Sequence, residues 1–306
     1  MGIQKRTIEI IGVPSDLGAN ARGACMGPAA IRIAGLWAKI AELGYHVIDR
    51  GDLSVPIRES LHPMSENLKY INQITEISTA LMNATQSSLD QGHTPIVLGG
   101  DHSIAIGTVS GVAAHFRSKG QKLGLIWVDA HADVNTPQSS PSGNIHGMPL
   151  AVILGSGHDA LVKLGGERIR IAPKNIALIG IRMIDMIEKE ILRSSGISYF
   201  TMRDIDEKGM TWVMEQAIAA ASDGTDAIHV SFDLDAIDPV YAPGVSTPVT
   251  GGLSFREAHL ALEKAYESGR LASIEFAELN PSNDIRSQTA TLCVDLIQSA
   301  LGKSIV

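Results

Sequence analysis

Short apolar runs alternate with longer segments of helical periodicity along almost the whole chain. A short apolar run bounded by polar residues or glycine is typical of a strand buried on both faces of a parallel sheet. Such runs occur at residues 8–13, 46–49, 95–98, 123–128, 176–180, 197–201, 227–232 and 272–276. The pattern therefore predicts a sheet of about eight strands.

Between these runs, apolar residues recur at three- and four-residue spacing, which predicts amphipathic helices. Segment 28–43 has Pro28 near its start and Gly44 just beyond its end, positions that these residues favour. The other predicted helices are 66–91, 104–118, 185–195, 203–221, 254–268 and 287–301. Because strands alternate with helices, we expect an α/β fold, a single-domain three-layer α/β/α arrangement with a mostly parallel sheet over residues 1–306.

Composition excludes several classes of protein. The 306 residues are 44% hydrophobic and 19% charged, as in ordinary globular proteins. The net charge is −8 without a basic run, so nucleic acid is not an expected partner, and no apolar stretch of about 18 residues suggests a membrane span. Cys25 and Cys293 lie far apart, and the N-terminus is more like a first strand than a signal peptide, so we expect a reducing, cytoplasmic location.

One glycine-rich segment matches a dinucleotide fingerprint. Residues 155–160 fit the pattern G-x-G-x-x-A, which requires a strand before it and a helix after it. The preceding segment 148–154 is compatible with a helix as much as with a strand, and the following LVKLGG is too short and glycine-broken for the required helix. Dinucleotide binding is therefore not predicted.

The stretch LIWVDAHADVNTP, residues 125–137, combines a predicted strand with three potential metal ligands, Asp129, His131 and Asp133. The end of a parallel strand lies at the carboxyl edge of the sheet, where open α/β folds bind ligands. Carboxylates without a partner there would be costly or would lose their charge. A metal site is favoured over a solvated junction, and the Ser-, Pro- and Asn-rich residues 135–144 that follow predict a loop that carries specificity.

Three further strand ends carry polar residues of the same kinds. Asp233 and Asp235 leave an apolar strand at a spacing of two, so both side chains can point the same way. His102 follows another strand and a Gly-Gly pair, where a capping or buried role is equally compatible. Glu275 and Glu278 lie within or just beyond the strand 272–276, and either is also compatible with an ordinary salt bridge.

Four carboxylates and two imidazoles would thus meet at one edge of the sheet, and two divalent cations would neutralise the carboxylates. The six residues are His102, Asp129, His131, Asp133, Asp233 and Asp235. Two ions roughly 3.5–4 Å apart could share Asp129 and Asp233. Oxygen-rich ligation with imidazole suits Mn²⁺ better than structural Zn²⁺.

Taken together, these motifs resemble the ureohydrolase family, and within it the arginases. The matching motifs are GGDHS (99–103), DAHADVNTP (129–137), SGNIHGMP (142–149), SFDLDAIDP (231–239), STPVTGGLSFRE (246–257) and ELNP (278–281). The segment RGACMGPAAIR (22–32) also resembles the family's opening, so the resemblance spans nearly the whole chain.

The resemblance implies a catalytic centre with two Mn²⁺ ions per subunit and a hydroxide that bridges them as the nucleophile. The implied ligands of one ion are His102, Asp129, Asp133 and Asp233. Those of the other ion are His131, Asp129, Asp233 and Asp235. Asp133 would also orient the hydroxide.

The same resemblance implies how a guanidino amino acid binds. Glu278 would bind the guanidinium group, with Thr247 beside it, and His146 would shuttle a proton. The residues implied at the amino-acid end are Asn135, Ser142 and Asn144 for the carboxylate and Asp185 for the α-amino group.

We therefore expect hydrolysis of L-arginine to L-ornithine and urea. The alternative within the family is an agmatinase or a guanidinobutyrase. The substrate of the first lacks the amino-acid carboxylate, and the substrate of the second lacks the α-amino group. A single-metal deacetylase and a regulatory metal-binding relative are less compatible with six ligands accompanied by His146 and Glu278. The family also implies a homotrimer or homohexamer, with Arg256 and Glu257 in a subunit contact.

Overall fold

A parallel sheet forms the centre of the structure, a computed structural model that describes residues 7–63, 67–166 and 171–304. Its eight strands follow the order β2-β1-β3-β8-β7-β4-β5-β6, and every neighbouring pair is parallel. The strands are β1 (Ile8–Gly12), β2 (Val47–Asp52), β3 (Thr94–Leu98), β4 (Leu123–Val128), β5 (Ile176–Ile181), β6 (Ser198–Thr201), β7 (Ala227–Asp233) and β8 (Leu271–Ala277). The predicted parallel sheet is confirmed.

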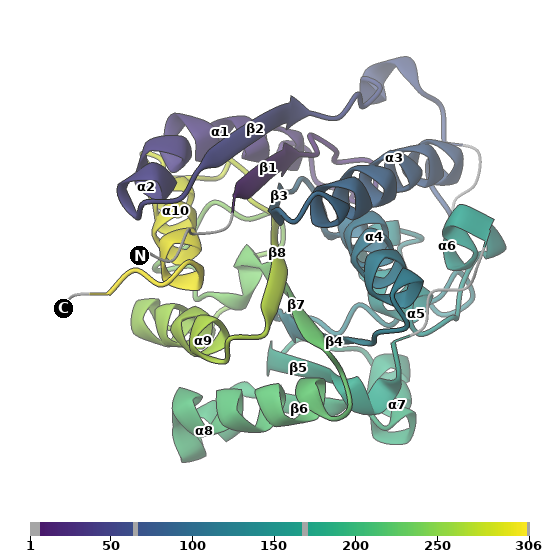
Figure 1. Cartoon of the computed structure of the whole chain (residues 1–306). Coiled ribbons are helices and arrows are strands. Elements are labelled where there is room, and N and C mark those ends of the chain that lie inside the picture. The colour runs from purple at the N-terminus through teal and green to yellow at the C-terminus, as the bar shows by residue number, and fades with distance from the viewer. Residues whose placement is uncertain (1–6, 64–66, 167–170, 305–306) are drawn as a thin grey trace.

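Helices cover both faces of this sheet (Figure 1). One face packs against α1 (Gly27–Ile33), α2 (Leu36–Glu42), α8 (Met202–Ser222), α9 (Phe255–Glu267) and α10 (Gln288–Ala300). The other packs against α3 (Ile71–Asp90), α4 (Ala105–Ser118), α5 (Pro149–Ile153), α6 (Asp159–Val162) and α7 (Met186–Ser195). Successive residues of a strand contact opposite layers, as Ile96 and Val97 of β3 do, so the central strands are apolar without interruption. The α/β/α prediction is confirmed.

The four strands whose ends carry candidate site residues lie next to one another in the middle of the sheet. β3, β8, β7 and β4 are consecutive neighbours, and their carboxyl ends lie at the same edge because all four are parallel. Trp127, Phe232 and Phe276 are fully buried near these ends and hold the strands in a rigid core. The strand ends that carry His102, Asp129, Asp233 and Glu278 therefore converge.

Some predicted boundaries were wrong. The helix predicted over 28–43 is two helices, because Gly35 adopts a left-handed φ of 93° between α1 and α2 while the apolar spacing continues across the break. The helix predicted to begin at Glu66 has its first described helical residue at Ile71, and Glu66 itself lies outside the described residues. Residues 149–153 of segment 148–154 form the helix α5, and residues 155–160 extend from just beyond α5 into the first two residues of the four-residue α6.

No helix in the described ranges is long and apolar enough to cross a membrane.

Candidate metal and substrate site

Each predicted metal ligand lies at the carboxyl end of a central strand or within five residues beyond it. His102 begins a short 3-10 turn after β3, and Asp129, His131 and Asp133 follow β4. Asp233 is the last residue of β7, and Asp235 lies in the 3-10 turn Leu234–Ala236 that continues it. The sheet rather than the loops therefore sets the positions of these side chains.

The first group forms around His102. Its Nδ1 lies 3.2 Å from Asp129 Oδ2, 3.1 Å from Asp133 Oδ2 and 3.1 Å from Asp233 Oδ2. His102, Asp129 and Asp233 are at most 2% exposed. One imidazole nitrogen thus faces three carboxylate oxygens in the interior.

The second group forms around His131 and shares Asp129 with the first. His131 Nδ1 lies 3.1 Å from Asp235 Oδ2 and 3.4 Å from Asp129 Oδ1. In each of the sets His102, Asp129, Asp133 and Asp129, His131, Asp235, the potential ligand atoms lie within 4.8 Å of one another. Because Asp129 belongs to both sets, the arrangement fits two ions with a shared carboxylate.

Hydrogen bonds from the chain orient these carboxylates. Asp129 accepts from the Trp127 indole at 2.9 Å and from the backbone N–H of His131 at 2.7 Å. Asp235 accepts from the Thr247 hydroxyl at 2.7 Å, and its own N–H donates to Asp233 at 2.7 Å. The carboxylates of Asp129, Asp233 and Asp235 are therefore held before any ion binds, which lowers the cost of assembling the site.

The site holds more negative charge than the chain neutralises. Burial and repulsion from Asp129 raise the pKa of Asp133 to about 6. Burial and the neighbouring carboxylates likewise raise the pKa of Asp235, and raise that of Asp233 well above its ordinary value. Burial disfavours protonation of His131, yet Asp235 and Asp129 raise its pKa to about 12. Bound divalent cations relieve this repulsion.

The orientation of His102 shows that the donors fit a metal ion. Ser231 donates its hydroxyl hydrogen to Glu275 Oε1 at 2.7 Å. The His102 Nε2 atom lies 2.8 Å from Ser231 Oγ, and because that hydroxyl hydrogen is already used, His102 Nε2–H donates to Ser231 Oγ. In the neutral imidazole this places the Nδ1 lone pair toward the three carboxylates, and this buried nitrogen makes no hydrogen bond. In this tautomer the lone pair and the carboxylate oxygens can hold one cation between them, as at a histidine–carboxylate metal centre. Without an ion, burial opposes protonation of His102, but Asp129, Asp133 and Asp233 raise its pKa well above the ordinary value, so a proton takes that place.

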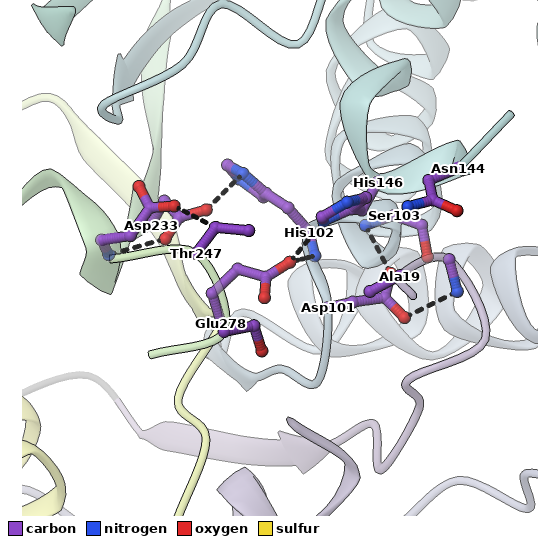
Figure 2. Close-up of polar contacts among 12 residues, drawn as sticks. Ala19, Asp101, His102, Ser103, Asn144, His146, Asp233, Thr247 and Glu278 are labelled. Carbon is purple, nitrogen blue, oxygen red and sulfur yellow. Dashed lines mark hydrogen bonds and ion pairs between the residues drawn. The ribbon is translucent and has the colours of Figure 1, made fainter. Parts of the chain in front are cut away.

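Glu278 and His146 form a second part of the site (Figure 2). Glu278 follows β8, is 1% exposed, and accepts from the backbone N–H of His102 at 2.9 Å through Oε1. His146 Nδ1 lies 2.9 Å from the same oxygen. Glu278 Oε2 is buried and has no hydrogen-bond partner among the described residues. A planar cation with several N–H donors matches this carboxylate.

Two of these side chains sit on strained backbone. Asp133 has a φ of 52° and Glu278 a φ of 66°, in the left-handed region that residues other than glycine rarely adopt. Such conformations persist where the surrounding structure holds them, and they are concentrated at functional sites.

A cavity of about 150 Å³ lies beside the proposed metal ligands and His146, whereas Glu278 and Asp129 are not among its lining residues. Its lining residues are His102, His131, Asp133, Asn135, His146, Gly147, Glu188, Asp233, Asp235 and Thr247. Larger hollows lie elsewhere, including one of about 560 Å³ at the end of α9 and α10, but the clustered ligands face the smaller cavity.

The predicted substrate contacts divide into two sets. Asn135 and Thr247 line the cavity, and Asn135 Nδ2 donates to Asp185 Oδ2 at 2.9 Å. The other predicted contacts, Ser142, Asn144, Asp185 and Glu278, do not line it. Ser142 is exposed and accepts from the N–H of Asn144 at 3.2 Å, and Asp185 caps α7 through the N–H groups of Ile187 and Glu188.

Comparison with known proteins identifies the family. A model of the Arginase family matches residues 6–302 of the chain. The chain belongs to the arginase family. An arginase from Bacillus caldovelox is 47% identical over 302 residues, covering 98% of this chain and 100% of the relative. An arginase from Bacillus subtilis (strain 168) is 46% identical over 301 residues, covering 98% and 99%.

Solved arginase structures share the fold. The crystal structure of the Bacillus caldovelox arginase matches with a TM-score of 0.94 at 47% identity, covering 99% of this chain and 100% of that chain. The family resemblance inferred from the sequence motifs is therefore confirmed.

From the sequence, Glu188 and Ser231 were given no role at this arginase-family site, and Glu275 was noted only as a carboxylate within a strand or as a salt-bridge partner. Glu188 lines the cavity, and its signal was available, because Asp185 and Glu188 form a capping box at the start of α7. Ser231 and Glu275 orient His102 from β7 and β8. Their pairing depends on which strands are neighbours, which local periodicity does not determine.

Proposed function

We propose that this protein hydrolyses L-arginine to L-ornithine and urea and uses two Mn²⁺ ions per subunit. The observation that carries the proposal is the pair of histidine–carboxylate groups that share Asp129 beside the buried carboxylate of Glu278. Relatives named arginase at 46–47% identity over the whole chain support the same activity.

The metal-binding role is assigned to the six clustered residues. His102, Asp129, Asp133 and Asp233 would hold one ion. His131, Asp235 and the shared Asp129 and Asp233 would hold the other. When bound, such ions lower the pKa of water so that hydroxide is available near neutral pH. The oxygen-rich donor set supports Mn²⁺ as the ion.

The chain's own residues would bind the guanidinium group and move a proton. The carboxylate of Glu278 would accept paired hydrogen bonds from the planar cation, with Thr247 nearby on Asp235. Asp133 would orient the nucleophile, and His146 would pass a proton to the leaving amine. Burial opposes protonation of His146, but Glu278 raises its pKa to about 9, so it carries a proton near neutral pH.

The loop after β4 would recognise the amino-acid end of the substrate. Asn135, Ser142 and Asn144 offer amide and hydroxyl groups to a carboxylate, and Asp185 offers a carboxylate to an ammonium. The hydrogen bond between Asn135 and Asp185 brings the two kinds of group together. This set favours L-arginine over agmatine, which lacks the carboxylate.

Assembly and location complete the proposal. Residues 1–306 would form one catalytic domain in a homotrimer or homohexamer, in the cytoplasm, with a role in arginine metabolism such as the urea cycle. The continuous sheet supports one domain, and the exposed Arg256 beside the half-buried Glu257 at the start of α9 supports the predicted subunit contact there.

The activity is tested by measuring urea release from L-arginine, agmatine and 4-guanidinobutyrate by folded, Mn²⁺-loaded protein with verified metal content. We expect the highest kcat/KM on L-arginine. Absence of urea from all three substrates would refute the proposal, and a preference for agmatine would refute the assignment of the carboxylate contacts.

A further inference from the structure

Lys69 joins three segments beside the site. Its Nζ donates to Asn20 Oδ1 at 2.9 Å, to the backbone carbonyl of Ser142 at 3.1 Å and to Asn144 Oδ1 at 3.3 Å. Two of these partners belong to the residues proposed to hold the substrate carboxylate. If Ser142 and Asn144 hold the substrate carboxylate as proposed, the ammonium group lies at the amino-acid end of the site.

Among the described residues, the hydrogen-bond partners of Lys69 Nζ are all neutral oxygens. Other lysines contact acids, as Lys163 does with Asp159 at 2.7 Å and Lys174 with Asp223 at 2.7 Å. A half-buried ammonium held by neutral acceptors leaves a positive potential that favours an anion nearby.

Contacts hold the backbone that directly follows Lys69. The next residue, Tyr70, adopts a left-handed φ of 56° at the start of α3 and is 7% exposed. The Arg58 guanidinium lies 5.3 Å from the centre of the Tyr70 ring and donates to the carbonyls of Asp16 and Ala19 at 2.9 Å. These contacts hold Lys69 and the segment that carries Asn20 in place against each other.

The loop that Lys69 contacts is also tied to that segment. The backbone N–H of His146 donates to the Gly18 carbonyl at 3.1 Å, and Ser142 Oγ accepts from the N–H of Asn144 at 3.2 Å. Lys69 supplies the cationic contact in this connection. Removing its charge would change the potential at Ser142 and Asn144 while the backbone bond at His146 remains.

We propose that Lys69 is a specificity-determining residue, which positions Ser142 and Asn144 and provides the positive charge that favours a substrate with an α-carboxylate. This inference rests on the proposed hydrolysis of L-arginine. Lys69 acts on binding of the carboxylate end, so it alters recognition of L-arginine and L-ornithine but not of their decarboxylated counterparts, agmatine and putrescine.

The test compares Lys69→Gln, which keeps a hydrogen-bond donor without the charge, with Lys69→Arg, which keeps the charge. For Lys69→Gln we expect KM for L-arginine and Kd for L-ornithine to rise about tenfold, the size of a lost charge-assisted contact. For the same variant we expect kcat for L-arginine, kcat/KM for agmatine and Kd for putrescine to stay near parental values. We expect Lys69→Arg to retain the parental preference for L-arginine over agmatine. Lys174→Met, at an exposed lysine before β5, is the control.

Equal losses for the carboxylate-bearing and decarboxylated ligands would reduce Lys69 to a structural residue and overturn the inference, as would unchanged binding of L-ornithine. Calorimetric binding of L-ornithine and putrescine decides this independently of turnover. If the parental protein released no urea, the proposed function would fail. In that case, a Lys69→Gln variant that lost binding of L-ornithine but kept binding of putrescine would still support the role of Lys69. Failure of the parental protein to bind L-ornithine would overturn the role of Lys69 as well.

Discussion

Glu278 shows how one residue can combine the properties that a guanidinium ligand requires. Its carboxylate is buried, one oxygen is held by His102 and His146, and the other has no hydrogen-bond partner among the described residues. A buried carboxylate oxygen without a donor is costly, so a cation with N–H groups stabilises it. Because His146 contacts the oxygen that already accepts from His102, a bidentate guanidinium would compete with His146.

Substitution of this residue should separate substrate binding from metal binding. For Glu278→Gln we expect kcat/KM on L-arginine to fall by about 10²–10³-fold, since loss of a buried charged partner costs about 3–4 kcal/mol. Metal content should remain at the parental value, because Glu278 is not a proposed ligand. Steady-state kinetics with elemental analysis measure both, and the exposed Glu267→Gln is the control. Near-normal turnover would contradict the role of Glu278.

At the scale of elements, α9 and α10 are joined through a buried histidine. His259 of α9 is 7% exposed, and its Nδ1 lies 2.8 Å from Ser299 Oγ of α10. Burial and the positive charge of Arg256, with a smaller contribution from Lys303, lower the pKa of His259, although Asp295 and Glu263 act in the opposite direction. The folded protein therefore resists protonation here more than the unfolded chain does.

This packing should make stability depend on pH. As the pH falls below about 6.5, the unfolded chain takes up a proton at this histidine that the folded protein disfavours, so the free energy of unfolding decreases. We expect His259→Gln to lose less stability than the parental protein between pH 7 and pH 5, as measured by urea denaturation at each pH. The exposed His62→Gln is the control. An equal loss in His259→Gln and the parental protein would exclude this contribution.

The strands were predictable because a strand buried on both faces is a continuous apolar run, as in β4 and β5. Helix boundaries were harder. Gly35 ends one helix and begins another without interrupting the apolar periodicity, so only its positive φ reveals the break.

The candidate site divides in a similar way. Asp129 and Asp233 were predictable as convergent residues because polar residues after parallel strands meet at one edge. Ser231, Glu275 and Lys69 were not, because their contacts depend on strand order and on a hydrogen bond from a distant segment. The metal-binding role of the six ligands stays a prediction.

At the scale of the whole molecule, the proposed metal site joins segments that are far apart in the chain. Its ligands follow β3, β4 and β7, and only the folded sheet brings them together. An ion that binds this arrangement and not the unfolded chain must stabilise the fold.

Metal removal should therefore lower the melting temperature. We expect chelation to lower Tm and Mn²⁺ to restore it, with about 2.7 kcal/mol of stabilisation when free Mn²⁺ is 100-fold above Kd. Asp129→Ala should remove most of the Mn²⁺-dependent rise, lower the metal content and abolish urea release, because it deletes a ligand shared by both groups. Calorimetry and elemental analysis measure these effects. The control is Asp226→Ala, at an exposed residue just before β7, which should behave like the parental protein. Unchanged metal content in Asp129→Ala would refute the assignment of Asp129 as a shared ligand.

The left-handed conformations of Asp133 and Glu278 have a consequence for directed evolution. A glycine at either position would relieve backbone strain of about 1 kcal/mol or more in the metal-free protein. At Asp133 it would also remove one of the carboxylates that repel each other when no ion is bound. A library screened only for survival of heating without metal would therefore accumulate inactive variants at Asp133, whereas loss of Glu278 would leave the buried N–H of His102 without its acceptor. Thermostable variants of this protein have to be selected by turnover after heating, with Mn²⁺ present throughout.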